Sequence, residues 1–351
     1  MAHSTHSIVL PNMLATWKWP RRINPHYGEV KQASAAWLAG FGAFSPKAQQ
    51  AFDRCDFSLL ASLAYPRLAK EHLRTGCDLM NLFFVIDEYT DVATESEARE
   101  MARVIMDAIR NPCQPRPDGE WIGGEIARQF WALASQTMGD TASKRFTASF
   151  DDYLDSVVTQ AADRDTKRVR SIPSYLLVRR RTIGALPSFA VMEAGMIIPD
   201  AVMDLPAVME LTDVVVEMLC IGNDQVSYNK EQACGDEHNL VAIVIKQFNI
   251  DAQGALNWVA GYHAALENRF NVAYQSLPRF GGPLDLAFQS YIDGLGNWVR
   301  ANDAWSFESA RYFGTRGLEI MKMRTLNLLP RKTPDNQQAE VGPEMIDASL
   351  L

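Results

Sequence analysis

The chain has 351 residues, of which 47% are hydrophobic and 22% are charged, and its formal net charge is −8 at pH 7. This composition allows one large domain, or two ordinary ones, with a sizeable apolar core. The acidic balance and the lack of a dense basic tract exclude a typical nucleic-acid-binding surface. No uncharged apolar run reaches the roughly 18 residues that a membrane span needs, so we expect none.

The cysteines and the start of the chain bear on location. Five cysteines are scattered along the sequence without a CxxC pair, and such a pattern fits reduced thiols in a cytosol. The segment MAHSTHSIVLPNML has neither a charged n-region nor a long apolar h-region, so it does not resemble a signal peptide. We therefore expect a cytoplasmic protein.

Helical periodicity dominates the chain from Val30 onward, and residues 1–26 before it are polar and proline-punctuated, which predicts a flexible N-terminal arm. The expected helices span 32–44, 46–54, 58–65, 70–91, 95–110, 126–138, 142–161, 174–195, 204–231, 239–248, 251–276, 283–306 and 309–323. The Pro/Gly-rich stretch 111–124 joins helices and not domains, and the tail 330–351 has a disorder-prone composition. The pattern predicts an all-α fold, a single helical bundle over residues 27–329 around an apolar cavity.

The stretch Asn81–Asp91, NLFFVIDEYTD, places acids at the end of an apolar helical run. Asp87 and Asp91 lie one helical turn apart, about 6 Å along the axis, and therefore share a face. Two carboxylates at a helix C-terminus repel each other and the macrodipole unless cations lie between them. Mg²⁺ prefers oxygen ligands and binds one or two carboxylates together with phosphate oxygens. By itself, however, a DExxD sequence is more often a solvated helix end than a metal site.

A second polar stretch, NDQVSYNKE at residues 223–231, follows another apolar run. Asn223, Ser227 and Glu231 recur at every fourth position and would form one oxygen-bearing stripe on a helix. An amide carbonyl, a hydroxyl and a carboxylate can together hold one hard cation, and the adjacent Lys230 could reach a phosphate. Two such sites on opposed apolar helices suggest metal ions that hold a diphosphate at the mouth of an apolar pocket.

Taken together, these motifs resemble those of the class I terpene synthases. DExxD, NDxxSxxxE and the pair Arg311-Tyr312 occur in that family's order and at its spacings, and the similarity extends from about Tyr27 to about Leu329. The sequence looks most like the basidiomycete-type sesquiterpene cyclases of mushroom-forming fungi. Glu88 replaces the second aspartate of the first motif, a departure that many fungal members share.

The resemblance implies a lyase that ionises farnesyl diphosphate, cyclises it to a sesquiterpene hydrocarbon and releases diphosphate with the help of three Mg²⁺ ions. The metal ligands it implies are Asp87, Asp91, Asn223, Ser227 and Glu231. The sequences DEYTD and NDQVSYNKEQ further resemble the fungal branch that performs a 1,11-closure, which implies a protoilludene-type product.

Other activities remain as alternatives. A 1,10-closing sesquiterpene synthase comes first. A chain-elongating prenyltransferase comes behind it, because the signature of that family is two aspartate-rich motifs and this chain has only one. A non-catalytic α-helical scaffold with fortuitous acids would show no Mg²⁺-dependent diphosphate release. The expected partner is the small-molecule substrate, bound by a monomer or a homodimer, with no nucleic acid and no membrane span.

Three consecutive arginines at 179–181 precede a helix break in LVRRRTIGALP. Pro187 cannot donate to the carbonyl of Ile183, so the helix should open near Ile183 and Gly184. In the cyclases that the chain resembles, an arginine four residues before such a glycine senses the diphosphate. That relation implies Arg180 as the sensor and Gly184 as the carbonyl that stabilises the carbocation, with the two neighbouring arginines as competing candidates.

The remaining candidates lie near the C-terminus and one or two turns before the metal stripes. Arg311 and Tyr312 could hydrogen-bond the diphosphate, since a guanidinium forks onto phosphate oxygens. Trp305 lies seven residues before Tyr312 and shares its face, where an indole attracts cations; a buried structural role is nearly as common. The expected lining residues are Met80, Phe83, Phe84, Val216, Leu219 and Cys220. Phe83, four residues before Asp87, is the favoured one.

Overall fold

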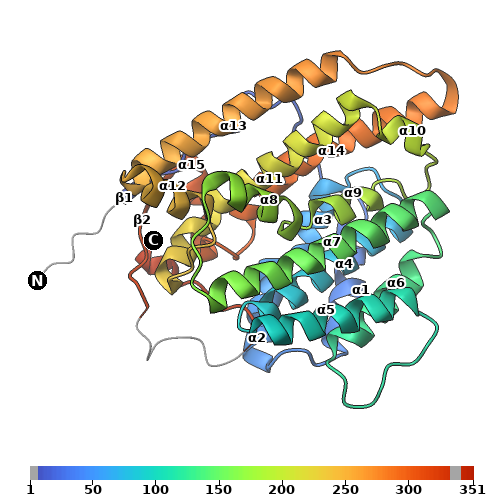
Figure 1. Ribbon diagram of the computed structural model, residues 1–351, viewed down its shortest axis with the longest axis horizontal. Helices are drawn as coiled ribbons and strands as arrows, with labels where there is room; N and C mark the ends of the chain where they lie inside the picture. Colours follow the sequence, from blue (N-terminus) through green and yellow to red (C-terminus); the bar gives the residue numbers. More distant parts are fainter. Residues whose placement is uncertain (1–6, 333–340) are drawn as a thin grey trace, which may run out of the picture.

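The computed structural model describes residues 7–332 and 341–351, and most of their regular structure is helical (Figure 1). The helices are α1 (Tyr27–Ala39), α2 (Pro46–Cys55), α3 (Phe57–Ala64), α4 (Lys70–Thr90), α5 (Glu95–Arg110), α6 (Gly123–Ala134), α7 (Asp140–Asp165), α8 (Ile172–Thr182), α9 (Ala185–Val191), α10 (Asp200–Met203), α11 (Pro206–Cys234), α12 (Leu240–Phe248), α13 (Ala252–Gln275), α14 (Gly282–Glu308) and α15 (Gly317–Met323). The expected all-α fold is confirmed. In the described ranges, no helix combines the length and the apolar character that crossing a membrane requires.

Two groups of helices enclose the interior. Helix α11 packs against α13 and α14, which lie in the upper half of Figure 1, while α4 to α7 pack on one another in the lower half. Helix α4 is buried on most of its faces because its second half is almost wholly apolar. Helix α11 begins with Pro206, whose missing N–H costs nothing at a first turn, and stops at Gly235, whose φ of 81° suits a residue without a side chain.

The helix that was expected over 174–195, with an opening near its middle, is interrupted between α8 and α9. Helix α8 ends at Thr182, and Gly184 follows with φ 68° before α9 begins. Pro187 lies in the first turn of α9, where its missing N–H is tolerated. The break near Ile183 is therefore where the proline predicted it.

Residues 7–26 pack on the bundle, which differs from the flexible arm that we expected for 1–26. Strand β1 (Ser7–Val9) pairs antiparallel with β2 (Thr325–Asn327). Leu10, Leu14 and Trp17 are buried, and the Trp17 indole donates to a carbonyl of α14 at 3.0 Å. These positions have the spacing of a helix face, but residues 10–26 form no helix, so the burial of the three side chains depends on a surface that only the folded bundle provides. The first six residues lie outside the described ranges.

The C-terminal region also differs from expectation. In place of one helix over 309–323 there are a turn, a short 3₁₀ helix (Gly314–Arg316) and α15. Part of the tail expected to be disordered is packed, because Leu351 is buried and its carbonyl accepts a hydrogen bond from Arg316. Residues 333–340 of that tail lie outside the described part of the chain.

Candidate active site

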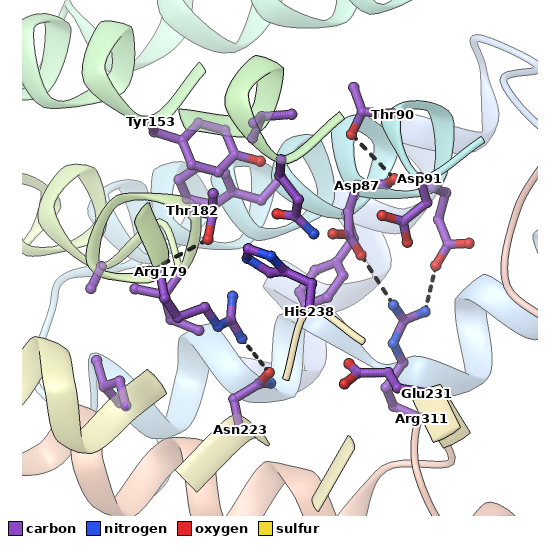
Figure 2. Close-up of a pocket in the computed structure, with 18 of the residues that line it drawn as sticks. Asp87, Thr90, Asp91, Tyr153, Arg179, Thr182, Asn223, Glu231, His238 and Arg311 are labelled. Carbon is purple, nitrogen blue, oxygen red and sulfur yellow. Dashed lines mark hydrogen bonds and ion pairs between the residues drawn. The ribbon is translucent and has the colours of Figure 1, made fainter. Parts of the chain in front are cut away.

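Residues from both polar stripes line the same pocket, which has a volume of about 280 Å³ and lies between α4, α7, α8, α11 and α14. This volume lies just below the range of small-molecule sites, about 300–1,000 Å³. In Figure 2, Asp87 and Asp91 lie on one side of the pocket and Asn223 and Glu231 on the other, with Arg311 near both groups. The tertiary fold thus brings together two motifs that are more than 130 residues apart in the sequence.

The α4 acids stand where the helix ends. The Asp87 side chain is 44% exposed, and one of its oxygens lies 3.2 Å from the Arg311 guanidinium. Water reaches Asp91, yet protein atoms surround it in the concave mouth. Desolvation therefore raises the pKa of Asp91 well above its usual value, and the negative charges of Asp87 and Glu88 raise it further. Desolvation likewise raises the pKa of Asp87, while Arg311 opposes this shift. This crowding of negative charge favours a cation at the site.

Arg311 is buried beside these acids. One of its terminal nitrogens donates to Glu88 at 2.5 Å, and the other reaches Asp87. Its guanidinium also lies 5.3 Å from the centre of the Phe84 ring, within range of a cation–π contact. Glu88, the second acid of DExxD, therefore faces Arg311 and holds it next to Asp87.

On the opposite side, the amide of Asn223 is held from both ends. Its oxygen accepts from Arg179 at 2.6 Å, and its nitrogen donates to the Tyr312 hydroxyl at 2.8 Å. The structure thus places the expected diphosphate residue Tyr312 beside the first residue of the α11 stripe. Lys230 also lines the pocket.

Ser227 and Glu231, the other two residues of this stripe, share one hydrogen-bonding partner, Asn239. The Asn239 side-chain amide lies 2.8 Å from a Glu231 oxygen and 3.3 Å from the Ser227 hydroxyl. Glu231 lines the pocket, whereas Ser227 is buried behind its surface. Desolvation raises the pKa of Glu231 to about 8, and the charges of Asp236 and Asp224 add to this shift.

The donor atoms fit Mg²⁺ shared with a diphosphate. In residues 7–332 and 341–351, no group of three or more His, Cys, Asp or Glu side chains is placed to hold a metal ion unaided. Asp87 and Asp91 nevertheless offer two hard oxygen donors on one helix face, and Mg²⁺ commonly takes its other ligands from water and phosphate. The pocket therefore suits cations that arrive together with an anionic substrate.

The three arginines of α8 point in different directions, because consecutive residues on a helix are about 100° apart. Arg180, the expected sensor, pairs with Glu217 of α11 and does not line the pocket. Arg181 lies on the outer surface, 57% exposed. Arg179 lines the pocket, and its guanidinium also donates to the buried Asp224 at 3.0 Å. Arg179 therefore occupies the position on the pocket that was expected for Arg180.

The helix break differs from expectation in a related way. The Gly184 carbonyl already accepts from the Ser188 hydroxyl at 2.7 Å, and Gly184 does not line the pocket. Its lack of a Cβ serves packing instead, because a Cβ there would lie 3.0 Å from the Phe83 ring. Ile183 does line the pocket, and within the described ranges no group donates a hydrogen bond to its carbonyl.

Aromatic side chains form much of the apolar lining. Of the residues expected there, the structure places Met80, Phe83, Phe84, Leu219 and Trp305 on the pocket. The Trp305 indole donates to the carbonyls of Cys55 and Asp56 at 2.8 and 3.0 Å, which fixes its orientation. Val216 and Cys220 are buried but do not line the pocket; the Cys220 thiol lies 3.5 Å from the Arg179 carbonyl, so it faces α8.

Comparison with known proteins agrees with this geometry. Residues 78–269, more than half of the chain, match the family described as terpene synthase family 2, C-terminal metal binding. The chain belongs to this terpene synthase family. It is 57% identical over 345 residues to a Delta(6)-protoilludene synthase of Armillaria gallica, with 98% of this chain and 99% of that protein covered. It is 55% identical to a Delta(6)-protoilludene synthase of Stereum hirsutum, with 98% and 93% covered.

Solved structures show the same fold. The terpene synthase described here matches α-eudesmol synthase with a TM-score of 0.75 at 18% identity, over 83% of this chain and 98% of that one. It matches hedycaryol synthase with a TM-score of 0.74 at 18% identity, over 85% and 98%. The family match and the relatives above 50% identity confirm the resemblance to class I terpene synthases, and the protein is a terpene cyclase.

Several pocket residues of this terpene synthase were missed by sequence reasoning. Four of them are on α7 and recur with helical spacing: Tyr153, Val157, Gln160 and Arg164. That stripe was readable, but nothing in it distinguishes a cavity from core. His238 comes from the loop after α11, and burial lowers its pKa to about 3, with nearby arginines acting in the same direction, so the imidazole is neutral. No local pattern predicts such a loop residue in the site.

Proposed function

We propose that this terpene synthase ionises farnesyl diphosphate and closes it by a 1,11 bond to a protoilludene-type hydrocarbon, with release of diphosphate. The observation that carries the proposal is a single pocket in which two oxygen-bearing stripes meet an aromatic cavity. Relatives of both genera named above are Delta(6)-protoilludene synthases and are similar over almost the whole chain. A prenyltransferase would need room and charge for a second diphosphate, and a scaffold would need no cavity.

The metal ions and the diphosphate have distinct sets of residues. Asp87 and Asp91 would hold Mg²⁺ on the α4 side, and the Asn223–Glu231 stripe would hold it on the α11 side, with three ions in all. Ser227 would have to turn or move with its helix to reach a cation, because it is buried. When bound, Mg²⁺ neutralises the charge that develops on the leaving diphosphate.

The positive side chains would orient the diphosphate. Arg311, Lys230 and the Tyr312 hydroxyl surround the mouth, and Arg179 approaches from α8. We assign the sensor role to Arg179 because it touches both the pocket and Asn223, whereas Arg180 is engaged by Glu217. Ile183 lies four residues after Arg179, and its carbonyl would be the one available to a carbocation.

The cavity would then control the fate of the cation. The rings of Phe83 and Tyr153 lie 4.8 Å apart on one wall, and Trp305 and Phe84 lie 5.7 Å apart on another. Aromatic faces stabilise cations and exclude the water that would quench them. A 1,11-closure needs the distal alkene folded back over C1 without prior isomerisation, and a narrow aromatic cavity favours such a fold.

We further propose a cytoplasmic location. All five cysteines are unpaired thiols, and Cys55, Cys77 and Cys220 are buried. Burial raises the pKa of Cys77 and of Cys220 to about 12, which keeps these thiols protonated and unreactive. Their protection suits a chain with no disulfide framework.

The test is to incubate the purified protein with Mg²⁺ and geranyl, farnesyl or geranylgeranyl diphosphate separately, and to identify the volatiles by mass spectrometry. We expect a tricyclic hydrocarbon from farnesyl diphosphate only, and none after chelation of the metal. Germacrene- or cadinane-type hydrocarbons would indicate a 1,10-closure and contradict the proposed 1,11-closure. Longer prenyl diphosphates would indicate a prenyltransferase, and an absence of diphosphate release would indicate a scaffold.

A further inference from the structure

The last turn of α7 forms hydrogen bonds with the turn that joins α4 to α5. The guanidinium of Arg164 donates to the carbonyl of Thr90, the last residue of α4, and lies 3.5 Å from the carbonyl of Ala93. The next residue, Asp165, accepts at 2.8 Å from the backbone N–H of Glu95, the first residue of α5. One short segment therefore holds both the end of one helix and the start of the next.

The charges of this contact match the two helix ends. Carbonyls at a helix C-terminus carry partial negative charge and favour a cation, while N–H groups at an N-terminus favour an anion. Helix α4 has no basic residue in its own last turn, although Asp87 and Asp91 add negative charge there. Arg164 supplies from α7 the positive charge that the α4 sequence lacks.

We propose that Arg164 is a positioning residue for the metal site on α4. By binding the carbonyls of Thr90 and Ala93, it fixes the last turn of α4, so that Asp87 and Asp91 keep a common face despite their mutual repulsion. Its effect passes through the backbone and not through a bond to either carboxylate. The inference rests on the proposed Mg²⁺-dependent function.

Neighbouring cations on the same rim provide a contrast. Arg164 also borders a second depression, together with Lys167, Arg168 and Arg170. Arg170 is paired with Asp163, and Arg168 is exposed with no side-chain hydrogen bond or ion pair to the described residues. Arg168→Gln therefore removes the same charge from the same rim without touching α4, which makes it the matched control for Arg164→Gln.

The experiment compares the full chain with its Arg164→Gln, Arg164→Lys and Arg168→Gln variants in two measurements. The first is the Mg²⁺ concentration at half-maximal turnover of saturating farnesyl diphosphate. The second is the affinity for Mg²⁺ with inorganic diphosphate by calorimetry. We expect Arg164→Gln to raise the first and weaken the second by about tenfold, as removal of groups that orient metal ligands does. Lysine should recover part of the loss, because an ammonium still donates to a carbonyl, and Arg168→Gln should match the parent.

Two outcomes would overturn the proposal. One is a folded Arg164→Gln protein, judged by circular dichroism and thermal unfolding, with the parent's Mg²⁺ titration and diphosphate affinity. The other is an equal shift in Arg168→Gln, which would assign the effect to rim charge alone. If Arg164→Gln does not fold, the Arg164→Lys variant provides the test. If Arg164 merely stabilises the fold, the lysine variant should have a lower Tm but the same Mg²⁺ dependence as the parent, and that result would also overturn the proposal. A parent protein that binds Mg²⁺ and diphosphate but consumes no farnesyl diphosphate would contradict the proposed function and leave the calorimetric comparison intact.

Discussion

The two polar stripes differ in how many of their oxygen atoms already accept hydrogen bonds from other side chains of the protein. On α4, Asp91 has no side-chain hydrogen bond or ion pair to the described residues, and Asp87 shares one oxygen with Arg311 at 3.2 Å. On α11, Asn223 is held by Arg179 and Tyr312, and Glu231 is held by Asn239. Asp91 is open to a cation, whereas Asn223 must first give up or share its contact with Arg179; Asp87 and Glu231 each keep one oxygen without a hydrogen bond to the described residues.

This difference predicts an order of assembly. A charge-assisted hydrogen bond is worth about 1.5–3 kcal/mol, so a cation reaches the α11 stripe only when its other ligands offset that loss. The diphosphate can do so, because it offers Arg179 new partners in place of Asn223. We therefore expect α4 to bind Mg²⁺ with little help and α11 to bind it only with diphosphate present.

Asp87→Asn should cause the largest loss. It removes a negative charge from the proposed metal site on α4, and we expect turnover of farnesyl diphosphate to fall roughly a thousandfold with the fold unchanged. The measurement is product formation at saturating Mg²⁺, with thermal unfolding as the control. Nearly normal product formation would contradict the assignment of α4 as a metal site.

Arg179→Ala should follow, with a loss of about a hundredfold in kcat, because it removes both the proposed diphosphate contact and the Asn223 contact. Arg181→Ala should leave kcat unchanged, since that side chain is largely exposed. Arg180→Ala should chiefly lower stability, by about 1–3 kcal/mol, because it leaves the buried Glu217 without its cation. Equal losses of kcat in all three variants would place the sensor elsewhere.

Glu231→Gln and Asn223→Ala should each raise the Mg²⁺ concentration at half-maximal rate by about tenfold, because both would ligate one ion. If they share that ion, the double variant should cost less than the product of the two effects. A Mg²⁺ titration identical to that of the parent would show that the α11 stripe is structural. Measured beside Asp87→Asn, this series tests the contrast between the open and the occupied stripe.

Phe83→Ala should have the smallest effect on rate and the clearest effect on product. It removes a ring that packs against Tyr153 and Gly184, and we expect substrate consumption to fall by about tenfold at most. The wider cavity should release earlier products, such as humulene-type hydrocarbons or acyclic alcohols, which mass spectrometry would detect. An unchanged product ratio would remove Phe83 from the proposed control of cyclisation.

Several features of this protein follow from residues that are close together in the sequence. Apolar residues at helical spacing predicted the all-α bundle, because a helix must bury its apolar face. The four-residue spacing of Asp87 and Asp91 put both on one face, and Pro187 predicted the break after Thr182. Each of these depends only on residues within a turn or two, so the sequence alone was sufficient.

Only the tertiary structure decided which of three arginines faces the pocket. The sequence placed Arg179, Arg180 and Arg181 on one helix, but the rotation of α8 about its axis depends on α11. There Asp224 and Glu217, two turns apart, receive Arg179 and Arg180 respectively. The packing of residues 7–26, the burial of Ser227 and the contact of Arg164 with Thr90 have the same origin. Each joins groups distant in sequence, and such contacts follow from how helices pack and not from the pattern along any one of them.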